Sequence, residues 1–313
     1  MIRRPANPAL PFETRPLRIV HISDIHLWQY TINPIRYLSK RMLGMASLVL
    51  GRASRFRLER LPELVNHVQT LRADHILITG DLTTTALPAE FRAARTGLAD
   101  WLGDPARATI IPGNHDRYTL YAHHSRRFER YFGNFSPQRS YPWLRKLDAD
   151  TAILGLDPTR SGISASGKLP RDQLIRAREI LANAGPIARL VIACHYPVAV
   201  PPRFEREYAH KPLVDRAGLM EWLRAIGSHI YCCGHVHAAW AYQPEEVPGQ
   251  LSLNAGAPLL RDKTGLRPPG FLEITLDGYS VIVHHHSWTG DAWAVRILFE
   301  AEDFFGLGPV ATD

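Results

Sequence analysis

Short apolar runs that alternate with amphipathic segments are the feature that most constrains how this chain can fold. Runs rich in Ile, Val and Leu end abruptly in polar residues and predict buried strands at 17–22, 75–79, 109–111, 151–156, 190–193 and 229–233. Helical periodicity lies between them, at 61–72, 88–102, 170–184 and 213–226, with Gly185 and Gly227 as candidate C-terminal caps. This alternation predicts largely parallel βαβ units with helices on the sheet faces.

The pattern changes after Trp240. The later runs, at 250–253, 271–276, 279–284 and 292–299, have no helices between them, and Asp277-Gly278 is a turn signal. These runs predict a second, mostly antiparallel sheet. The 313 residues permit two domains, but a β-rich enzyme of this size is often one. We therefore expect an irregular lead-in at 1–16, one domain at 17–300 and a loosely ordered tail at 301–313.

Polar residues follow five of the predicted strands at the point where each strand ends. The segments are Asp24-Ile25-His26, Gly80-Asp81, Gly113-Asn114-His115-Asp116, Cys194-His195 and Gly234-His235-Val236-His237. Ligands of parallel sheets bind outside the carboxyl ends of the strands, so these side chains should converge. Two nearby metal ions need a shared anionic bridge and neutral donors, which carboxylate, imidazole and amide groups supply. The glycines allow the backbone to turn sharply or to approach a ligand closely.

Taken in order, the five segments resemble the signature of the calcineurin-like metallophosphoesterase superfamily: D-x-H, G-D, G-N-H-[DE], H and G-H-x-H. The resemblance covers about residues 17–237 and implies an α/β fold, a four-layer α-β-β-α sandwich of two mixed β-sheets flanked by helices. It also implies two metal ions, drawn from manganese, iron and zinc. Asp24, His26 and His237 would hold the first, Asn114, His195 and His235 the second, and Asp81 would bridge them.

The resemblance further implies hydrolysis of a phosphoester by a metal-bridging hydroxide that attacks phosphorus in line. His115 would stabilise the transition state or protonate the leaving oxygen, and we expect Asp116 to orient its imidazole. The Gly-Asn-His-Asp block is similar to that of class III cyclic-nucleotide and glycerophosphodiester phosphodiesterases. A phosphodiesterase is therefore the favoured activity.

Two alternatives remain open at this stage. One is a membrane-associated pyrophosphohydrolase that acts on a lipid-linked nucleotide similar to UDP-diacylglucosamine, although enzymes of that branch commonly carry Arg where this chain has His115. The other is a non-catalytic metal-binding scaffold. Such proteins often lack a ligand or the catalytic histidine, and this sequence keeps all of them.

The segment 35–61 combines apolar residues at three- and four-residue spacing with seven Arg or Lys residues and a single acidic residue, Glu59. It is compatible with a helix in the interface of an anionic membrane, with a lid over the site, or with an oligomer contact. The segment follows the loop of Asp24 and His26. It therefore begins near the proposed metals.

Net charge and cysteine content limit the binding partners and the cellular compartment that the sequence predicts. A net charge of +7 favours anionic partners, here a small-molecule or lipid-linked phosphoester and an anionic membrane surface. In the basic segment 35–61 the aromatic residues that binding of single-stranded nucleic acid requires are sparse, so we expect no nucleic acid partner. Three cysteines form no disulfide framework, and the first 16 residues lack the apolar core of a signal peptide. These features predict a cytoplasmic protein, with peripheral contact to the inner face of the membrane as a further expectation.

None of the other histidines and cysteines singled out in the sequence is assigned to the metals, although His123 or His124 is a candidate to line a substrate pocket. His284, His285 and His286 fall in a predicted strand, where adjacent side chains point to opposite faces. His21 lies inside the first strand, and the three cysteines are expected to be small buried residues.

Overall fold

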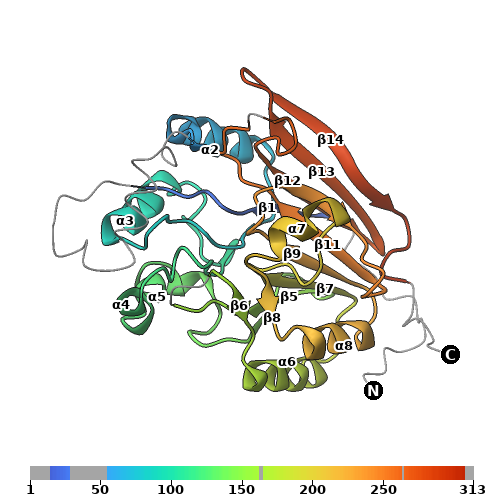
Figure 1. The fold of residues 1–313 in the computed structure, drawn as a ribbon. Helices are drawn as coiled ribbons and strands as arrows, with labels where there is room; N and C mark the ends of the chain where they lie inside the picture. The colour runs from blue at the N-terminus through green and yellow to red at the C-terminus, as the bar shows by residue number, and fades with distance from the viewer. Residues whose placement is uncertain (1–14, 29–54, 162–164, 263, 307–313) are drawn as a thin grey trace.

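The computed structural model describes residues 15–28, 55–161, 165–262 and 264–306. Two six-stranded sheets lie face to face, with helices on the two outer sides (Figure 1). Most of the basic amphipathic segment 35–61 lies outside the described residues, which include only its last part from Arg55 onward. The lead-in up to residue 14 also lies outside them.

The first sheet, which we call sheet A, has the strand order β14-β13-β12-β1-β2-β3. Its strands are β1 (Leu17–Ile22), β2 (His75–Ile78), β3 (Ala108–Ile110), β12 (Gly270–Asp277), β13 (Ser280–Trp288) and β14 (Trp293–Ala301). Strands β1, β2 and β3 are parallel, and β12 joins the other edge of β1 in antiparallel register. The three parallel carboxyl ends therefore lie side by side.

The second sheet, sheet B, has the order β10-β11-β9-β7-β5-β4. Its strands are β4 (Trp143–Lys146), β5 (Thr151–Leu156), β7 (Arg189–Cys194), β9 (His229–Cys233), β10 (Ala239–Tyr242) and β11 (Gln250–Ala255). Strands β5, β7, β9 and β11 are parallel, and β4 and β10 are antiparallel edges. Two residues each of β6 (Gly167–Lys168) and β8 (Leu213–Val214) form a small separate pair.

Helices cover the outer face of each sheet (Figure 1). On sheet A they are α2 (Leu61–Thr70), α3 (Pro88–Gly97), α4 (Leu120–His124) and α5 (Arg127–Phe132); on sheet B they are α6 (Arg171–Asn183), α7 (Glu205–Tyr208) and α8 (Ala217–Ala225). Short 3₁₀ turns lie at η4 (Leu58–Arg60), η5 (Gly133–Phe135) and η6 (Pro202–Phe204). Gly185 and Gly227 follow α6 and α8 with positive φ, as predicted for C-terminal caps.

Strand β7 shows why the apolar runs are continuous rather than alternating. Val191 and Ala193 pack between the two sheets, whereas Leu190 and Ile192 pack against the helices of sheet B. Both faces of the strand are buried, so both must be apolar. The four-layer sandwich predicted from the resemblance is confirmed.

The predicted division of the strands between the sheets is wrong in one respect. We expected the six earlier strands to form one sheet and the later ones another, but the early strands are split between the two sheets. The later strands β12, β13 and β14 extend sheet A, whereas β11 pairs in parallel with β9 in sheet B. Two further boundaries differ: 213–214 form β8 before α8 begins at Ala217, and Phe304 and Phe305 are buried between the sheets instead of starting a loose tail.

The buried histidine that begins β2 predicts acid sensitivity of the fold. His75 is 3% exposed, its Nε2 lies 2.8 Å from the hydroxyl of Thr109, and burial, with the charges of Arg145 and Arg107, lowers its pKa to about 3. The unfolded chain, with a pKa near 6.5, binds the proton more tightly. Stability from this group is therefore complete above about pH 6.5 and is lost as the pH falls toward 3, by about 1.4 kcal/mol per pH unit.

His75→Gln cannot titrate but keeps a hydrogen-bonding group near Thr109. We expect the difference in unfolding free energy between wild type and this variant to shrink by about 2 kcal/mol from pH 7 to pH 5, as measured by urea unfolding. A difference that stays constant with pH would show that His75 does not titrate in this way.

Candidate metal centre

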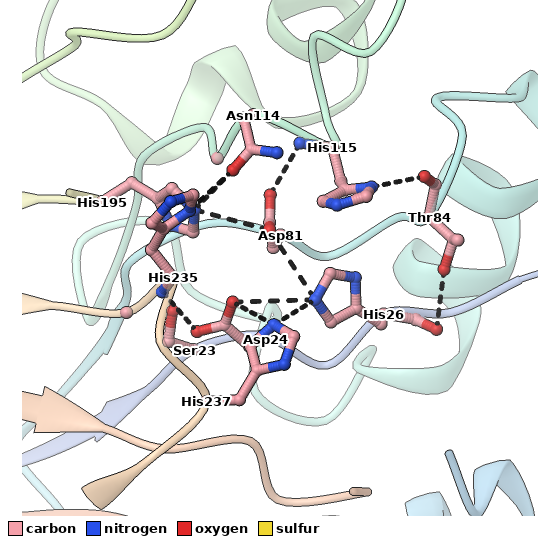
Figure 2. Close-up of polar contacts among 12 residues, drawn as sticks. Ser23, Asp24, His26, Asp81, Thr84, Asn114, His115, His195, His235 and His237 are labelled. Carbon is pink, nitrogen blue, oxygen red and sulfur yellow. Dashed lines mark hydrogen bonds and ion pairs between the residues drawn. The ribbon is translucent and has the colours of Figure 1, made fainter. Parts of the chain in front are cut away.

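Five loops meet at one edge of the sandwich, each directly after the carboxyl end of a strand. Sheet A contributes the loops after β1, β2 and β3, and sheet B contributes those after β7 and β9. Their side chains point toward a common centre, which Figure 2 shows. Main-chain hydrogen bonds join the loops, from Asp24 N to Gly80 O at 3.0 Å and from Gly234 N to His195 O at 3.0 Å. The structure thus brings together all seven residues predicted as metal ligands.

The backbone at this centre is strained. Asp24, His26, Asp81, His235 and His237 all have positive φ, between 52° and 72°. Non-glycine residues rarely adopt this left-handed conformation, which costs about 1 kcal/mol or more each. The surrounding packing must hold these five loop positions against that cost. Backbone strain that is concentrated in one cluster of loops indicates a functional site.

Glycines are required where the loops come close to each other. A Cβ atom on Gly113 would lie 2.2 Å from Oδ1 of Asp81, and one on Gly234 would lie 2.4 Å from Oδ2 of Asp24. The glycines therefore leave room for the two carboxylates. We expect Gly113→Ala to displace Asp81 and to weaken metal binding by about 10-fold or more.

Gly103 provides the matched control for this substitution, because an added Cβ there meets nothing within 4 Å. Titration of the metal-free protein with Mn²⁺ should show weaker binding for Gly113→Ala and wild-type binding for Gly103→Ala. Equal affinities in both variants would contradict the close-approach argument.

The first group of side chains surrounds Asp24. Its Oδ1 lies 3.6 Å from Nε2 of His26 and 3.3 Å from Nε2 of His237, while Oδ2 accepts a hydrogen bond from His235 N at 2.9 Å. Asp81 completes the group, with Oδ2 3.6 Å from Nε2 of His26. All four ligand atoms lie within 4.8 Å of one another, the spacing of a metal site.

The second group also uses Asp81. Its Oδ2 lies 3.4 Å from Nε2 of His195, and the ligand atoms of Asp81, His195 and His235 again lie within 4.8 Å of one another. The amide oxygen of Asn114 lies 3.2 Å from Nε2 of His195 and 2.9 Å from Nδ1 of His235. The two groups thus share the carboxylate that the sequence predicts as a bridge.

Main-chain carbonyls select which histidine nitrogen faces the centre. Nδ1 of His195 donates to Thr79 O at 2.7 Å, and Nε2 of His235 donates to Lys211 O at 2.9 Å. These bonds turn Nε2 of His195 and Nδ1 of His235 toward Asn114 and Asp81, where each nitrogen could ligate a metal ion. Sequence patterns do not reveal such partners, because a main-chain carbonyl belongs to every residue.

Electrostatics give the centre ionised carboxylates and two neutral imidazoles, whereas His195 differs: burial opposes its charge, but the Asp81 carboxylate outweighs burial and raises the pKa of His195 to about 9. The pKa of Asp24 is held well below its usual range: burial opposes this, but the attraction of the nearby imidazoles, that of His237 above all, outweighs it. The pKa of Asp81 is also strongly lowered, since its histidine neighbours outweigh burial. Burial lowers the pKa of His237 to about 4, and burial with the nearby His195 lowers that of His235 well below 6.5. A metal ion binds ionised carboxylates and neutral imidazoles, so metal binding at His195 would release a proton.

The donor set fits a pair of metal ions. Nε2 of His26 and Nε2 of His237 lie only 3.0 Å apart, although a neutral imidazole nitrogen that faces the centre offers a lone pair. Oδ1 of Asp24 is buried and accepts no hydrogen bond from any described residue. A cation between these atoms would satisfy all three. Nitrogen and oxygen donors without thiolate suit manganese, iron or zinc alike, so the donors leave the metal's identity open.

His115 lies beside the two groups and not within them. Its ring is 4.9 Å from that of His26 and stacks at 5.5 Å on the ring of Tyr118, and it is partly exposed. Nδ1 lies 2.6 Å from the carbonyl oxygen of Thr84 and donates to it (Figure 2). The main-chain N–H of His115 donates to Oδ1 of Asp81 at 2.7 Å.

The sequence predicts that Asp116 orients His115, and the structure gives that role to Thr84 instead. The carboxylate of Asp116 turns into the loops and accepts hydrogen bonds from Thr83 N at 2.9 Å and Gly113 N at 3.0 Å. Burial and the charge of Asp81 raise the pKa of Asp116 to about 6. Asp116 therefore joins the loop after β2 to the loop after β3. A carboxylate beside a turn finds backbone amides more readily than it finds the neighbouring ring.

Phe56 is a site residue that the sequence analysis misses. Its ring lies 4.8 Å from that of His26 and 6.0 Å from that of His237, and it is 5% exposed. An isolated antiparallel bridge to Leu260 fixes this position, with hydrogen bonds between Arg57 N and Leu259 O and between Arg261 N and Arg55 O. In the sequence, Phe56 is a single aromatic residue among arginines and belongs to no motif. Its place beside the centre follows only from the long-range pairing with Leu260.

Among the described residues, none of those predicted to be structural belongs to either ligand group. His21 is fully buried and its Nε2 lies 2.9 Å from the hydroxyl of Thr79. His285 and His286 are buried on β13, and Nε2 of His286 lies 3.0 Å from Glu273. All three cysteines are free and buried, where burial raises their pKa. These assignments as packing residues are confirmed.

Solved structures with the same fold include phosphatases. A dimetal phosphatase from Danio rerio has a TM-score of 0.58 at 12% identity, and the match covers 90% of this chain and 99% of that one. A purple acid phosphatase from yellow lupin (Lupinus luteus) has a TM-score of 0.59 at 13% identity and covers 91% of this chain, which spans 54% of the lupin protein. PhoD has a TM-score of 0.59 at 10% identity, covering 98% and 73% of the two chains. At such identities these likenesses show the fold.

Among the helices that the structure describes, none has the length and apolar character to cross a bilayer.

Sequence comparison identifies the family. No curated protein matches the chain significantly. A family model described as calcineurin-like phosphoesterase matches residues 17–239, which is most of the chain and includes every proposed ligand. The chain therefore belongs to the calcineurin-like phosphoesterase family.

Proposed function

We propose that this protein hydrolyses phosphodiesters with two metal ions that share Asp81. The observation that carries the proposal is the pair of ligand groups around one carboxylate, with His115 beside them. Family membership supports hydrolysis of phosphoesters in general, and the preference for diesters is our inference from the Gly-Asn-His-Asp block. Two bound metal ions would supply Lewis acidity that activates a water molecule and neutralises the phosphoryl oxygens.

The residues of the chain account for the remaining chemistry. Water oxygen forms a bond to phosphorus and releases a proton to the solvent, the bond from phosphorus to the leaving oxygen breaks, and the products are a phosphomonoester and an alcohol; His115 then takes up a proton from the solvent. His115 holds a proton at Nε2 and donates it to the leaving oxygen, while the Thr84 carbonyl keeps Nδ1 protonated and the ring in place. No side chain needs to form a phosphoenzyme.

The partly exposed residues indicate where the substrate enters. His115 and His237 are partly exposed, whereas Asp24, His26, Asp81 and His195 are buried. The scissile phosphate would approach from the side of His115 and His237. The deeper side chains then hold the metals, and His115 remains close to the leaving group.

A substrate panel tests the proposal. Purified protein with measured metal content is assayed with Mn²⁺ on bis(p-nitrophenyl) phosphate, p-nitrophenyl phosphate and cyclic AMP. We expect metal-dependent turnover that is fastest on a diester. Preference for the monoester would replace the diesterase assignment with a monoesterase, and turnover of no phosphoester by metal-loaded protein would sink the proposal.

A further inference from the structure

Lys211 is a positively charged residue at the edge of the candidate metal centre. It lies in the loop between α7 and β8, and its Nζ donates to the carbonyl oxygen of His235 at 3.4 Å. Its own carbonyl accepts from Nε2 of the same histidine at 2.9 Å. The side chain and the main chain of Lys211 thus both contact a proposed metal ligand.

The loop that carries Lys211 is held in place on both sides. The hydroxyl of Tyr208 donates to Pro197 O and accepts from Leu213 N, the latter at 2.8 Å, which closes the loop across its base. Pro212 restricts the backbone of Lys211, and its carbonyl accepts from Gly167 N at 3.0 Å. The ammonium therefore extends from a fixed anchor at the edge of the centre.

Lys211 and His115 contact different histidines of the metal centre. His115 is next to His26, which belongs to the first ligand group, whereas Lys211 contacts His235, which belongs to the second. A phosphoryl group that spans both groups would have His115 at one end and Lys211 at the other. His115 would meet the leaving oxygen, and Lys211 would meet an oxygen that stays on phosphorus.

Lys211 places a positive charge beside the second ligand group, through the contact of its Nζ with the His235 carbonyl. A lysine ammonium is a strong point-charge partner for phosphate oxygens.

We propose that Lys211 is a substrate-binding residue whose ammonium contacts a non-bridging phosphoryl oxygen at the end of the site away from His115. The proposal rests on the proposed phosphoesterase function. Its chemistry concerns binding of the phosphoryl group before and after the bond breaks. Lys211 should therefore affect affinity for substrate and for inorganic phosphate more than it affects turnover.

Lys211→Met tests this proposal, because it removes the ammonium and keeps the main-chain carbonyl that His235 needs. In Mn²⁺-loaded protein we expect inorganic phosphate to bind about 10- to 100-fold more weakly by calorimetry, the loss typical of a hydrogen bond to a charged group. KM for bis(p-nitrophenyl) phosphate should rise in parallel while kcat changes less than about 2-fold. Metal content should equal that of wild type.

Two further variants test whether the effect comes from the charge of Lys211. Lys211→Arg keeps the charge and should restore most of the phosphate affinity. Lys168→Met removes an exposed lysine that pairs with Asp215, and it should behave as wild type in every assay. Unchanged phosphate affinity in Lys211→Met, absent phosphate binding by the wild type, or loss of metal from Lys211→Met would each overturn the proposal.

Failure of the phosphodiesterase proposal can be told apart from failure of the Lys211 proposal. If metal-loaded wild type hydrolyses no phosphoester, the phosphodiesterase assignment fails, but phosphate binding remains measurable. Binding that still depends on Lys211 would then support a site that recognises phosphate without cleaving an ester.

Discussion

Asp81→Asn should remove most of the bound metal and lower phosphodiester hydrolysis by more than about 100-fold. The substitution leaves Oδ1 available for the main-chain N–H of His115 but replaces a charge shared by both ligand groups. Metal ions contribute several kcal/mol of transition-state stabilisation, which sets the size of the loss. Elemental analysis of the purified variant gives metal content, and turnover of bis(p-nitrophenyl) phosphate gives activity.

Asp172→Asn is the matched control, because it removes the same charge from an exposed position on α6. It should keep both metal content and activity. Full metal content in Asp81→Asn would remove the bridging role from this carboxylate, and loss of metal in both variants would point to a general effect of net charge.

His115→Gln should lower kcat by about 100- to 10,000-fold for substrates with a poor leaving group, which is the range expected of a general acid. Metal content should not change, because His115 belongs to neither ligand group. The loss should be much smaller for bis(p-nitrophenyl) phosphate, whose p-nitrophenolate leaves without a proton. A comparison of that substrate with an alkyl diester measures the difference.

His124→Gln provides the control for this variant, since His124 is exposed on α4 and its Nδ1 bonds Leu120 O. It should leave both rates unchanged. An equal loss on good and poor leaving groups in His115→Gln would assign His115 to charge stabilisation and not to proton donation.

The sequence predicted the site better than it predicted the arrangement of the strands. Each ligand block is local: a buried run ends and a donor follows, in three of the five blocks directly after a glycine, so five short patterns locate the residues of the centre. Their meeting then follows from the rule that ligands bind at the carboxyl ends of parallel strands.

The division of strands between two sheets depends on pairings between residues far apart in the chain. Strand β1 pairs with β12, where Leu17 lies opposite Leu276, and an apolar run carries no information on which distant run it will join. The contact of Phe56 with His26 has the same origin in a pairing with Leu260. The hydrogen bonds to the carbonyls of Thr79, Thr84 and Lys211 could not be predicted for another reason. A main-chain acceptor has no side-chain signature in the sequence.

The supply of ligands from both sheets has a consequence for stability. Asp24, His26, Asp81 and Asn114 follow strands of sheet A, whereas His195, His235 and His237 follow strands of sheet B. Neither sheet holds a complete set, so metal affinity and the packing of one sheet on the other are linked equilibria. A cavity made in the core between the sheets, far from any ligand, should be measurable as weaker metal binding, and excess metal should raise the melting temperature of such a variant.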